Sequence, residues 1–293
     1  MKGGRFITVI SLVLVLSAST LSCGTREEAG EKVGVVVTIL PQVEFVESVG
    51  GERVEVSVMV PPGASPHTYE PSPSQMAALS KAEMYAKVGT AVEFELVWMD
   101  RLIAINKEML VVDCSKGVQL IEMVGEPEDE HEHEAMDPHI WMSPLNVKIM
   151  VHNIYEGLVQ VDPDNKTYYE QNRDAYLWEL SKLDQDIRDG LSGMTNRTFM
   201  VYHPAFGYFA KEYNLAMLPI EVEGKEPTAS SIAHLIEQAK KHDIKVIFAS
   251  PQFNPQSAEV IAKAIGGRVV FIDSLAKDYI LNMRQLLGEL VQL

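Results

Sequence analysis

A chain of 293 residues, 46% of them hydrophobic, is long enough to bury a sizeable core in one or two domains. Its formal net charge of −16 argues against a nucleic-acid partner, because nucleic acids favour basic surfaces. The same charge suits a soluble surface that attracts cations.

The first residues have the features of an export signal. Lys2 and Arg5 precede an apolar run from Phe6 to Leu16, and small residues follow at 17–19. This order is typical of a secretory signal peptide, which we place at residues 1–22. The run is too short to span a bilayer. A core helix at this position is disfavoured because nothing amphipathic follows it.

Cys23 lies where such a signal would be cleaved. The sequence from Thr20 to Gly24 resembles a bacterial lipoprotein cleavage site, although Thr20 stands where Leu is usual. We predict a lipid anchor on Cys23 that holds the protein at a membrane surface without a span, with residues 23–32 as a tether. Ordinary cleavage at this place would instead leave a soluble secreted protein.

An N-terminal lobe is predicted over residues 33–160, where short apolar runs alternate with helical periods. Such alternation indicates βαβ units and a parallel sheet. Helices are expected at Val92–Ile105 and at Pro144–Val159, where Ser143 can cap the first turn. Cys114 is expected to be a buried thiol without a disulfide partner. The predicted strands are Val33–Leu40, Val54–Val60, Met84–Val88 and Met109–Asp113.

A long helix is predicted at Thr167–Gly190, within a connecting segment of residues 161–192. Its length of about 40 Å is that of a small domain, so it could join two lobes. The opposite face of this helix is charged. The apolar stripe at helical spacing consists of Tyr169, Tyr176, Leu180, Leu183, Ile187 and Leu191.

A C-terminal lobe is predicted over residues 193–293. Helices are expected to begin near Thr228, Pro255 and Tyr279. The fold class is therefore α/β, with two similar lobes, each with a mainly parallel sheet and flanking helices, joined by one long rigid helix. The predicted strands are Thr198–Tyr202, Ala216–Val222, Val246–Ala249 and Val269–Asp273.

Three histidines and one aspartate occur in settings typical of ligand sites. His67 lies in a loop with five prolines, residues 61–74, and His139 lies in a proline-braced turn. His203 and Asp273 each come at the end of a predicted strand, where ligands bind in open α/β sheets. Three imidazoles and one carboxylate would form a four-coordinate shell between the lobes. Such a shell suits Zn²⁺, with bonds of about 2.0–2.2 Å.

The spacing of these residues leaves other interpretations open. Each histidine taken alone is more often a satisfied core residue, and Asp273 could be a helix cap. Carboxylates that orient the ligating rings are expected behind them, with Asp137 or Glu226 as candidates.

An acidic tract at residues 126–134 contains His131 and His133. Short histidine-rich tracts bind metals weakly, so these two residues could collect Zn²⁺ near the site. The alternative is a solvated surface loop without that role.

The motifs together resemble one family over nearly the whole chain after the signal. PPGASPHTYEPSPS, DPHIWMSP, YHPAFGYF, EGKEPTA, PQF and VVFIDSLAKDYILNM occur in its order. The family is that of the metal-binding solute receptors of zinc and manganese ABC importers. It implies two α/β lobes, one connecting helix and a metal between the lobes. It also implies that the metal ligands are His67, His139, His203 and Asp273.

The chain departs from the family pattern at two positions, and the first of them bears on the fourth ligand. Ser274 replaces a Pro that often follows the aspartate, and Ser250 replaces a Glu that often precedes PQF. Glu70 or a water molecule is therefore an alternative to Asp273. Manganese members commonly have Glu in place of His203, so the resemblance favours zinc over Mn²⁺.

The expected function is that of an exported, monomeric zinc receptor that delivers Zn²⁺ to an ABC transporter permease. The same receptor class for Mn²⁺ or Fe²⁺ is the first alternative, and a metal-containing surface adhesin is the second. An exported zinc hydrolase is the least favoured, because no HExxH-type motif is present and the sequence supports no Ser-His-Asp or Cys-His arrangement. We therefore expect no enzymatic activity.

Overall fold

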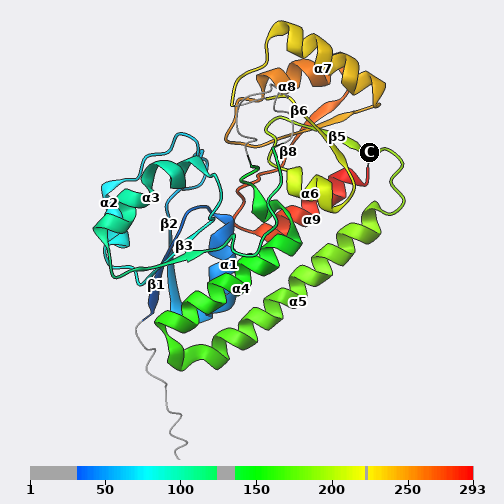
Figure 1. Ribbon diagram of the computed structural model, residues 1–293. Helices are drawn as coiled ribbons and strands as arrows, with labels where there is room; N and C mark the ends of the chain where they lie inside the picture. The colour runs from blue at the N-terminus through cyan, green and yellow to red at the C-terminus, as the bar shows by residue number, and fades with distance from the viewer. Residues whose placement is uncertain (1–31, 124–135, 222–223, 293) are drawn as a thin grey trace, which may run out of the picture. The chain divides into compact units, whose positions relative to one another are not determined.

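The computed structural model describes residues 32–123, 136–221 and 224–292 (Figure 1). The first lobe contains a four-stranded sheet in the order β2-β1-β3-β4, and all of its neighbouring strands pair in parallel. Parallel neighbours require crossover connections, which the helices between the strands supply. The strands are β1 Val33–Val37, β2 Val54–Val58, β3 Met84–Lys87 and β4 Leu110–Asp113.

The second lobe repeats this arrangement. Its sheet has the order β6-β5-β7-β8, again with parallel pairs only. Counted along the chain, the strands of the two lobes occupy the same places in their sheets. The predicted pair of similar parallel-sheet lobes is thereby confirmed. The strands are β5 Thr198–Val201, β6 Ala216–Pro219, β7 Val246–Ala249 and β8 Arg268–Phe271.

Three of the described helices, α2, α4 and α7, begin at a residue whose side chain caps them. Ser143 caps α4 and Thr228 caps α7, both through the side-chain oxygen. Helix α2 was not predicted, although Ser72 and Gln75 form a capping box at its start. The helices other than α5 are α1 Pro41–Gly50, α2 Pro73–Leu79, α3 Glu93–Ile105, α4 Pro144–Val161, α6 Gly207–Glu212, α7 Ala229–Lys241, α8 Gln256–Ile265 and α9 Tyr279–Leu290.

Helix α5, Lys166–Leu191, is the predicted long helix and has 26 residues. Its buried residues are the six residues of the predicted apolar stripe. The helix packs on α1 and α4 of the first lobe and on α9, which follows the last strand of the second (Figure 1). One buried stripe therefore stabilises helices from both lobes.

Glu44 of α1 adds hydrogen bonds to the packing of helices α1, α5 and α9. Its carboxylate accepts hydrogen bonds from the hydroxyl of Tyr176 on α5, at 2.6 Å, and from the backbone N–H of Tyr279, at 2.6 Å. Tyr279 is the first residue of α9, which has no side-chain cap of its own. Burial raises the pKa of Glu44, and the bonds from Tyr176 and Tyr279 partly offset that effect. A residue of the first lobe thus caps a helix of the second.

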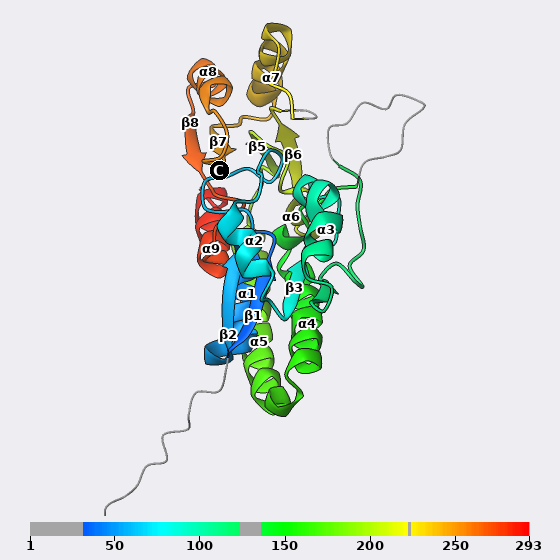
Figure 2. The ribbon, with the colours of Figure 1, turned by 90° about the vertical axis from the view of Figure 1, so that its left-hand side faces the viewer.

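Two hydrophobic clusters fill the molecule. The larger one contains residues of both lobes and of α5, and the smaller one consists of residues of the second lobe, including some of α7 and α8. These two helices pack against each other beside the second sheet (Figure 2). Strand β5 contributes to both, because Val201 belongs to the larger cluster and Met200 to the smaller. No helix in the described part of the chain is long and apolar enough to cross a membrane.

Several strands end earlier than predicted. Strand β1 ends at Val37 and β8 at Phe271, although the apolar runs continue beyond both residues. Ile39 and Ile272 are buried in the connections that follow. These residues are apolar because the core covers them.

Candidate metal centre

His67, His139 and His203 lie together although they are far apart in the sequence. The Nε2 atoms of His139 and His203 are 3.1 Å apart, and the ring of His67 lies edge-on to that of His203, with 5.2 Å between centroids. All three rings line a small cavity of about 20 Å³, enough for one ion or one water molecule. The other lining residues are Ser65, Pro66, Trp141, Gln252, Phe253, Ser274 and Leu275.

The facing Nε2 atoms of His139 and His203 have the spacing of two ligands on one ion. Bonds of about 2.0–2.1 Å at a tetrahedral angle place two nitrogen ligands about 3.4 Å apart. Within the described ranges, no group of three or more His, Cys, Asp or Glu side chains is arranged so that it could hold a metal ion. His139 and His203 contact each other directly through their Nε2 atoms. The ring of His67 lies edge-on to the ring of His203.

Each of the three rings has a carboxylate behind it. His139 Nδ1 lies 2.7 Å from Asp137, His67 Nδ1 lies 2.9 Å from Glu93, and His203 Nδ1 lies 3.3 Å from Glu221. A ring that donates from Nδ1 to a carboxylate keeps Nε2 free as a metal ligand.

The prediction of these carboxylates was correct for Asp137 and wrong for Glu226. Glu226 accepts hydrogen bonds from the hydroxyls of Tyr202 and Ser257 instead. Glu93 and Glu221 were missed. A signal for Glu221 was present in the sequence, because it follows strand β6, the sheet neighbour of the strand that leads to His203.

The three imidazoles differ in burial and in their pKa. The side chains of His139 and His203 are 6% and 7% exposed, whereas that of His67 is 29% exposed. Burial lowers the pKa of His203, and this outweighs the opposite effect of Glu221. The hydrogen bond to Glu93 raises the pKa of His67. Burial acts to raise the pKa of Glu93, but the bond and charge of His67 outweigh it and lower that pKa.

Asp273 lies next to the cavity without lining it. Its Oδ1 accepts hydrogen bonds from Gln252 Nε2, at 2.7 Å, and from the backbone N–H of Leu275, at 2.8 Å. Gln252 and Leu275 both line the cavity. The Oε1 atom of Gln252 is buried without a hydrogen-bond partner among the described residues. Glu70 is exposed on the His67 loop and does not line the cavity.

The remaining candidates lie elsewhere or outside the described residues. Cys114 is a free, buried thiol as predicted, and burial raises its pKa. His152 lies on the exposed side of α4 beside Glu156. Cys23, His131 and His133 fall outside the described residues, so the anchor and the accessory capture role stay predictions.

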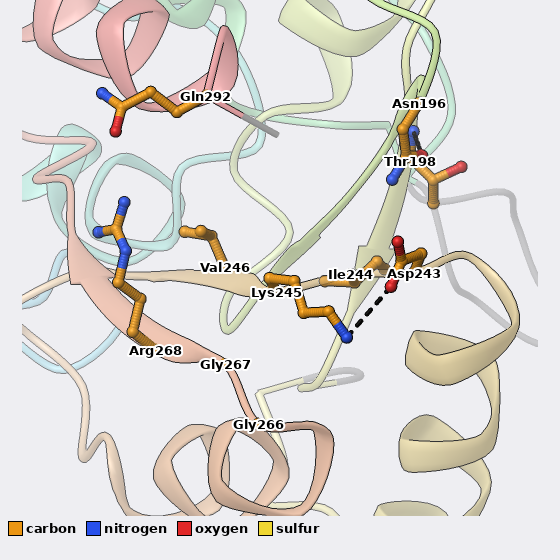
Figure 3. A pocket seen from close by; sticks show the side chains of 10 residues that line it. All are labelled: Asn196, Thr198, Asp243, Ile244, Lys245, Val246, Gly266, Gly267, Arg268 and Gln292. Atoms are coloured by element: carbon orange, nitrogen blue, oxygen red, sulfur yellow. Dashed lines mark hydrogen bonds and ion pairs between the residues drawn. The ribbon is translucent and has the colours of Figure 1, made fainter.

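A larger pocket of about 460 Å³ lies at the other end of the second sheet (Figure 3). It is at the amino ends of β5, β7 and β8, whereas ligands bind beyond the carboxyl ends in such sheets. Its charges are already paired, since Lys245 Nζ contacts Asp243 at 3.1 Å and Arg268 contacts Glu289 at 2.6 Å. We therefore place the functional site at the histidine cavity.

The fold and the histidine cavity define a two-lobed metal-binding receptor. The family model described as "Zinc-uptake complex component A periplasmic" (ZnuA) matches residues 35–293. The chain therefore belongs to the ZnuA family.

Curated relatives agree with this assignment. The high-affinity zinc uptake system protein ZnuA of Bacillus subtilis is 32% identical over 284 residues, which cover 93% of this chain and 88% of the relative. The zinc-binding lipoprotein AdcA of Streptococcus pneumoniae (strain R6) is 29% identical over 91% of this chain. This chain spans only 55% of that relative's length.

Solved structures share the fold. A crystal structure of ZnuA has a TM-score of 0.84 and 40% identity, and the match covers 89% of this chain and 99% of that one. The laminin-binding protein Lmb of Streptococcus agalactiae, described as bifunctional with adhesin and metal-transporting activity, has a TM-score of 0.79 and 27% identity. That match covers 89% of this chain and 99% of Lmb.

Proposed function

We propose that this protein captures Zn²⁺ outside the cytoplasm and delivers it to the permease of an ABC transporter. In this proposal the Nε2 atoms of His67, His139 and His203 bind the ion. The observation that carries it is the pair of facing Nε2 atoms of His139 and His203, each ring with a carboxylate at Nδ1. Two buried imidazole nitrogens 3.1 Å apart, each on a ring with a carboxylate at Nδ1, form a site that a cation stabilises.

The donor set favours zinc over Mn²⁺ or Fe²⁺. Imidazole is a ligand of intermediate softness and suits Zn²⁺, whereas Mn²⁺ prefers sites richer in oxygen. Three imidazoles with one oxygen ligand match a tetrahedral zinc shell. The names of the relatives, zinc uptake protein and zinc-binding lipoprotein, support the same metal.

Asp273 is our candidate for the fourth ligand. Gln252 and the N–H of Leu275 both bind its Oδ1, which leaves Oδ2 as the atom that could approach the ion. Glu70 and water are the alternatives. Replacement of Asp273 by Ala is expected to weaken zinc binding, and replacement of Glu70 by Ala is not. The opposite result would assign the fourth position to Glu70, and no effect of either would assign it to water.

The cellular setting is also a proposal. A lipid on Cys23 would hold the receptor at the outer face of the cytoplasmic membrane or in the periplasm, as a monomer beside its permease. The lipoprotein name of AdcA supports the anchor. The likeness to Lmb supports an adhesin role as a second candidate function. Binding of the metal-free protein to laminin would favour that role.

The test is calorimetric titration of the chelator-treated protein with Zn²⁺ and, separately, with Mn²⁺. We expect tight one-to-one zinc binding, weak Mn²⁺ binding, and a large loss of zinc affinity in His139→Ala and His203→Ala. His152→Ala, which removes an exposed histidine on α4, is the matched control and should bind as the unmodified chain does. A preference for Mn²⁺ would overturn the metal assignment, and no tight binding of either ion would overturn the function.

A further inference from the structure

The carboxylate of Asp137, in the first lobe, packs against Gly207 of the second lobe. The Cα of Gly207, the first residue of α6, lies so close that a Cβ built there would be 2.2 Å from Asp137 Oδ2. Real Cβ atoms do not approach an oxygen this closely, so any larger residue must displace something. Gly207 has no left-handed backbone angle. Glycine is therefore required at position 207 because a larger residue lacks space, and not because of the backbone conformation.

Asp137 has little freedom to yield to such a residue. It is fully buried, and its Oδ1 accepts from both the backbone N–H and the Nδ1 of His139, at 2.9 and 2.7 Å. Its Oδ2 is buried without a hydrogen-bond partner among the described residues. A side chain at position 207 would thus rotate the carboxylate away from His139 or push α6 outward.

Tyr208, the next residue, forms a hydrogen bond with the backbone of Asp137. Its hydroxyl donates to the carbonyl oxygen of Asp137 at 3.0 Å and accepts from the backbone N–H of Ile121 at 3.3 Å. The N–H of Asp137 in turn donates to the carbonyl of Ile121 at 2.8 Å. Side chain and backbone of Asp137 are therefore both fixed from the second lobe.

The same short segment also provides His203. Residues 203–208 begin with His203, whose imidazole faces His139. They end with Gly207 and Tyr208, which contact Asp137. We propose that Gly207 and Tyr208 are positioning residues, which fix His139 opposite His203 by holding Asp137 from across the lobe boundary. This inference rests on the proposed function, because it assigns a role in zinc binding to residues that do not contact the ion.

The consequence is a coupling between the two lobes at the metal. Loss of a hydrogen-bonded partner behind a metal-binding histidine costs about 10–100-fold in metal affinity. Gly207→Ala should reach this range even though it deletes no polar group. Tyr208→Phe removes one hydrogen bond and leaves the carboxylate in place, so we expect a measurable loss that is smaller than that of Gly207→Ala and below about 10-fold.

The experiment is a double-mutant cycle in the chelator-treated protein, with zinc affinity measured by competition against a chromogenic chelator. The variants are Gly207→Ala, Asp137→Ala and the double replacement. Asp137→Ala leaves space for the new Cβ, so the double variant should match Asp137→Ala within about twofold. If the two losses multiply, Gly207 acts independently of Asp137 and the inference is overturned.

Two controls separate positioning from general destabilisation. Gly288→Ala changes a glycine of α9 where a Cβ meets nothing within 4 Å, and Tyr213→Phe removes a hydroxyl that binds Asp184 instead. Both should keep the original zinc affinity. Folding of Gly207→Ala is checked by circular dichroism and thermal unfolding without metal. If this variant does not fold, the zinc affinities of Tyr208→Phe and Tyr213→Phe are compared instead. Equal affinity in that pair, or original affinity in a folded Gly207→Ala, overturns the inference.

Failure of the proposed function gives a different result. If the unmodified chain does not bind zinc, the function is wrong before any variant is compared. If the unmodified chain binds zinc tightly and the positioning variants bind equally well, only the inference fails.

Discussion

The two candidate ligand histidines of the first lobe, His67 and His139, are held in contrasting ways. His139 and Asp137 are both buried, and the second lobe packs against Asp137. His67 and Glu93 form a similar ion pair with 29% and 45% of their side chains exposed. Water screens this second pair. One imidazole is therefore preorganised by the fold, whereas the other is placed by a local pair at the surface.

The largest effect is expected at the buried pair. Asp137→Asn keeps the size of the side chain but removes the charge that holds His139 Nδ1–H. We expect zinc affinity to fall by about 10–100-fold, as measured by chelator competition. Asp113→Asn is the control, because Asp113 pairs with Lys87 at the end of β4 and neither residue lines the cavity. Unchanged affinity in Asp137→Asn would contradict the contrast between the two pairs.

An intermediate effect is expected at Glu221. Its carboxylate is as buried as Asp137 but lies 3.3 Å from His203 Nδ1, a longer contact than the 2.7 Å at His139. Glu221→Gln should weaken zinc binding by about 10-fold, less than Asp137→Asn in the same assay. A larger loss than at Asp137 would show that distance to the ring does not rank these carboxylates.

A smaller effect is expected at the exposed pair. Glu93→Gln removes the charge behind His67, but solvent can replace part of the lost interaction. We expect zinc affinity to fall by less than about 10-fold. Glu156→Gln, which alters the similar His152–Glu156 pair on α4, should have no effect. A loss at Glu93 equal to that at Asp137 would abolish the distinction between a preorganised and a locally placed ligand.

The smallest effect concerns pH and stability without metal. The pKa of His67 is raised above its ordinary 6.5, so its contribution is complete below pH 6.5 and is lost as pH rises through the raised pKa. The pKa of Glu93 is lowered below its ordinary 4.5, so its contribution is present above pH 4.5 and is lost as pH falls through the lowered pKa. The pair therefore stabilises most between these values.

Urea unfolding of the chelator-treated protein tests this window. The free energy of unfolding of Glu93→Gln should fall below that of the unmodified chain by at most about 1 kcal/mol, because the pair is partly exposed. The difference should be greatest near pH 5.5 and shrink on both sides. A difference that is constant across pH would mean that the effect of the substitution is not electrostatic.

Much of the fold followed from local patterns. The apolar stripe of α5 and the cap at Ser143 identified two helices within one or two residues at each end. The eight apolar runs identified eight strands, because an alternation of strand and helix admits few arrangements other than parallel sheets. Helix α2 was missed because its seven residues carry no long periodic pattern, although its capping box was visible.

The ends of the strands could not be obtained in the same way. Ile39 and Ile272 are as apolar as the strand residues before them, because burial and not strand pairing determines their character. The carboxylate behind His67 was equally hidden, since Glu93 is 26 positions away in the sequence and lies beside His67 only in the folded chain.

The sequence by itself determined the lobes, the connecting helix and the histidines, because periodicity, caps and motifs are local properties of the chain. Only the tertiary structure decided which groups act on those histidines. It selected Glu221 in place of Glu226 behind His203, and it brought Gly207 of one lobe against Asp137 of the other. Such choices depend on distances between segments far apart in the sequence, and local patterns do not encode those distances.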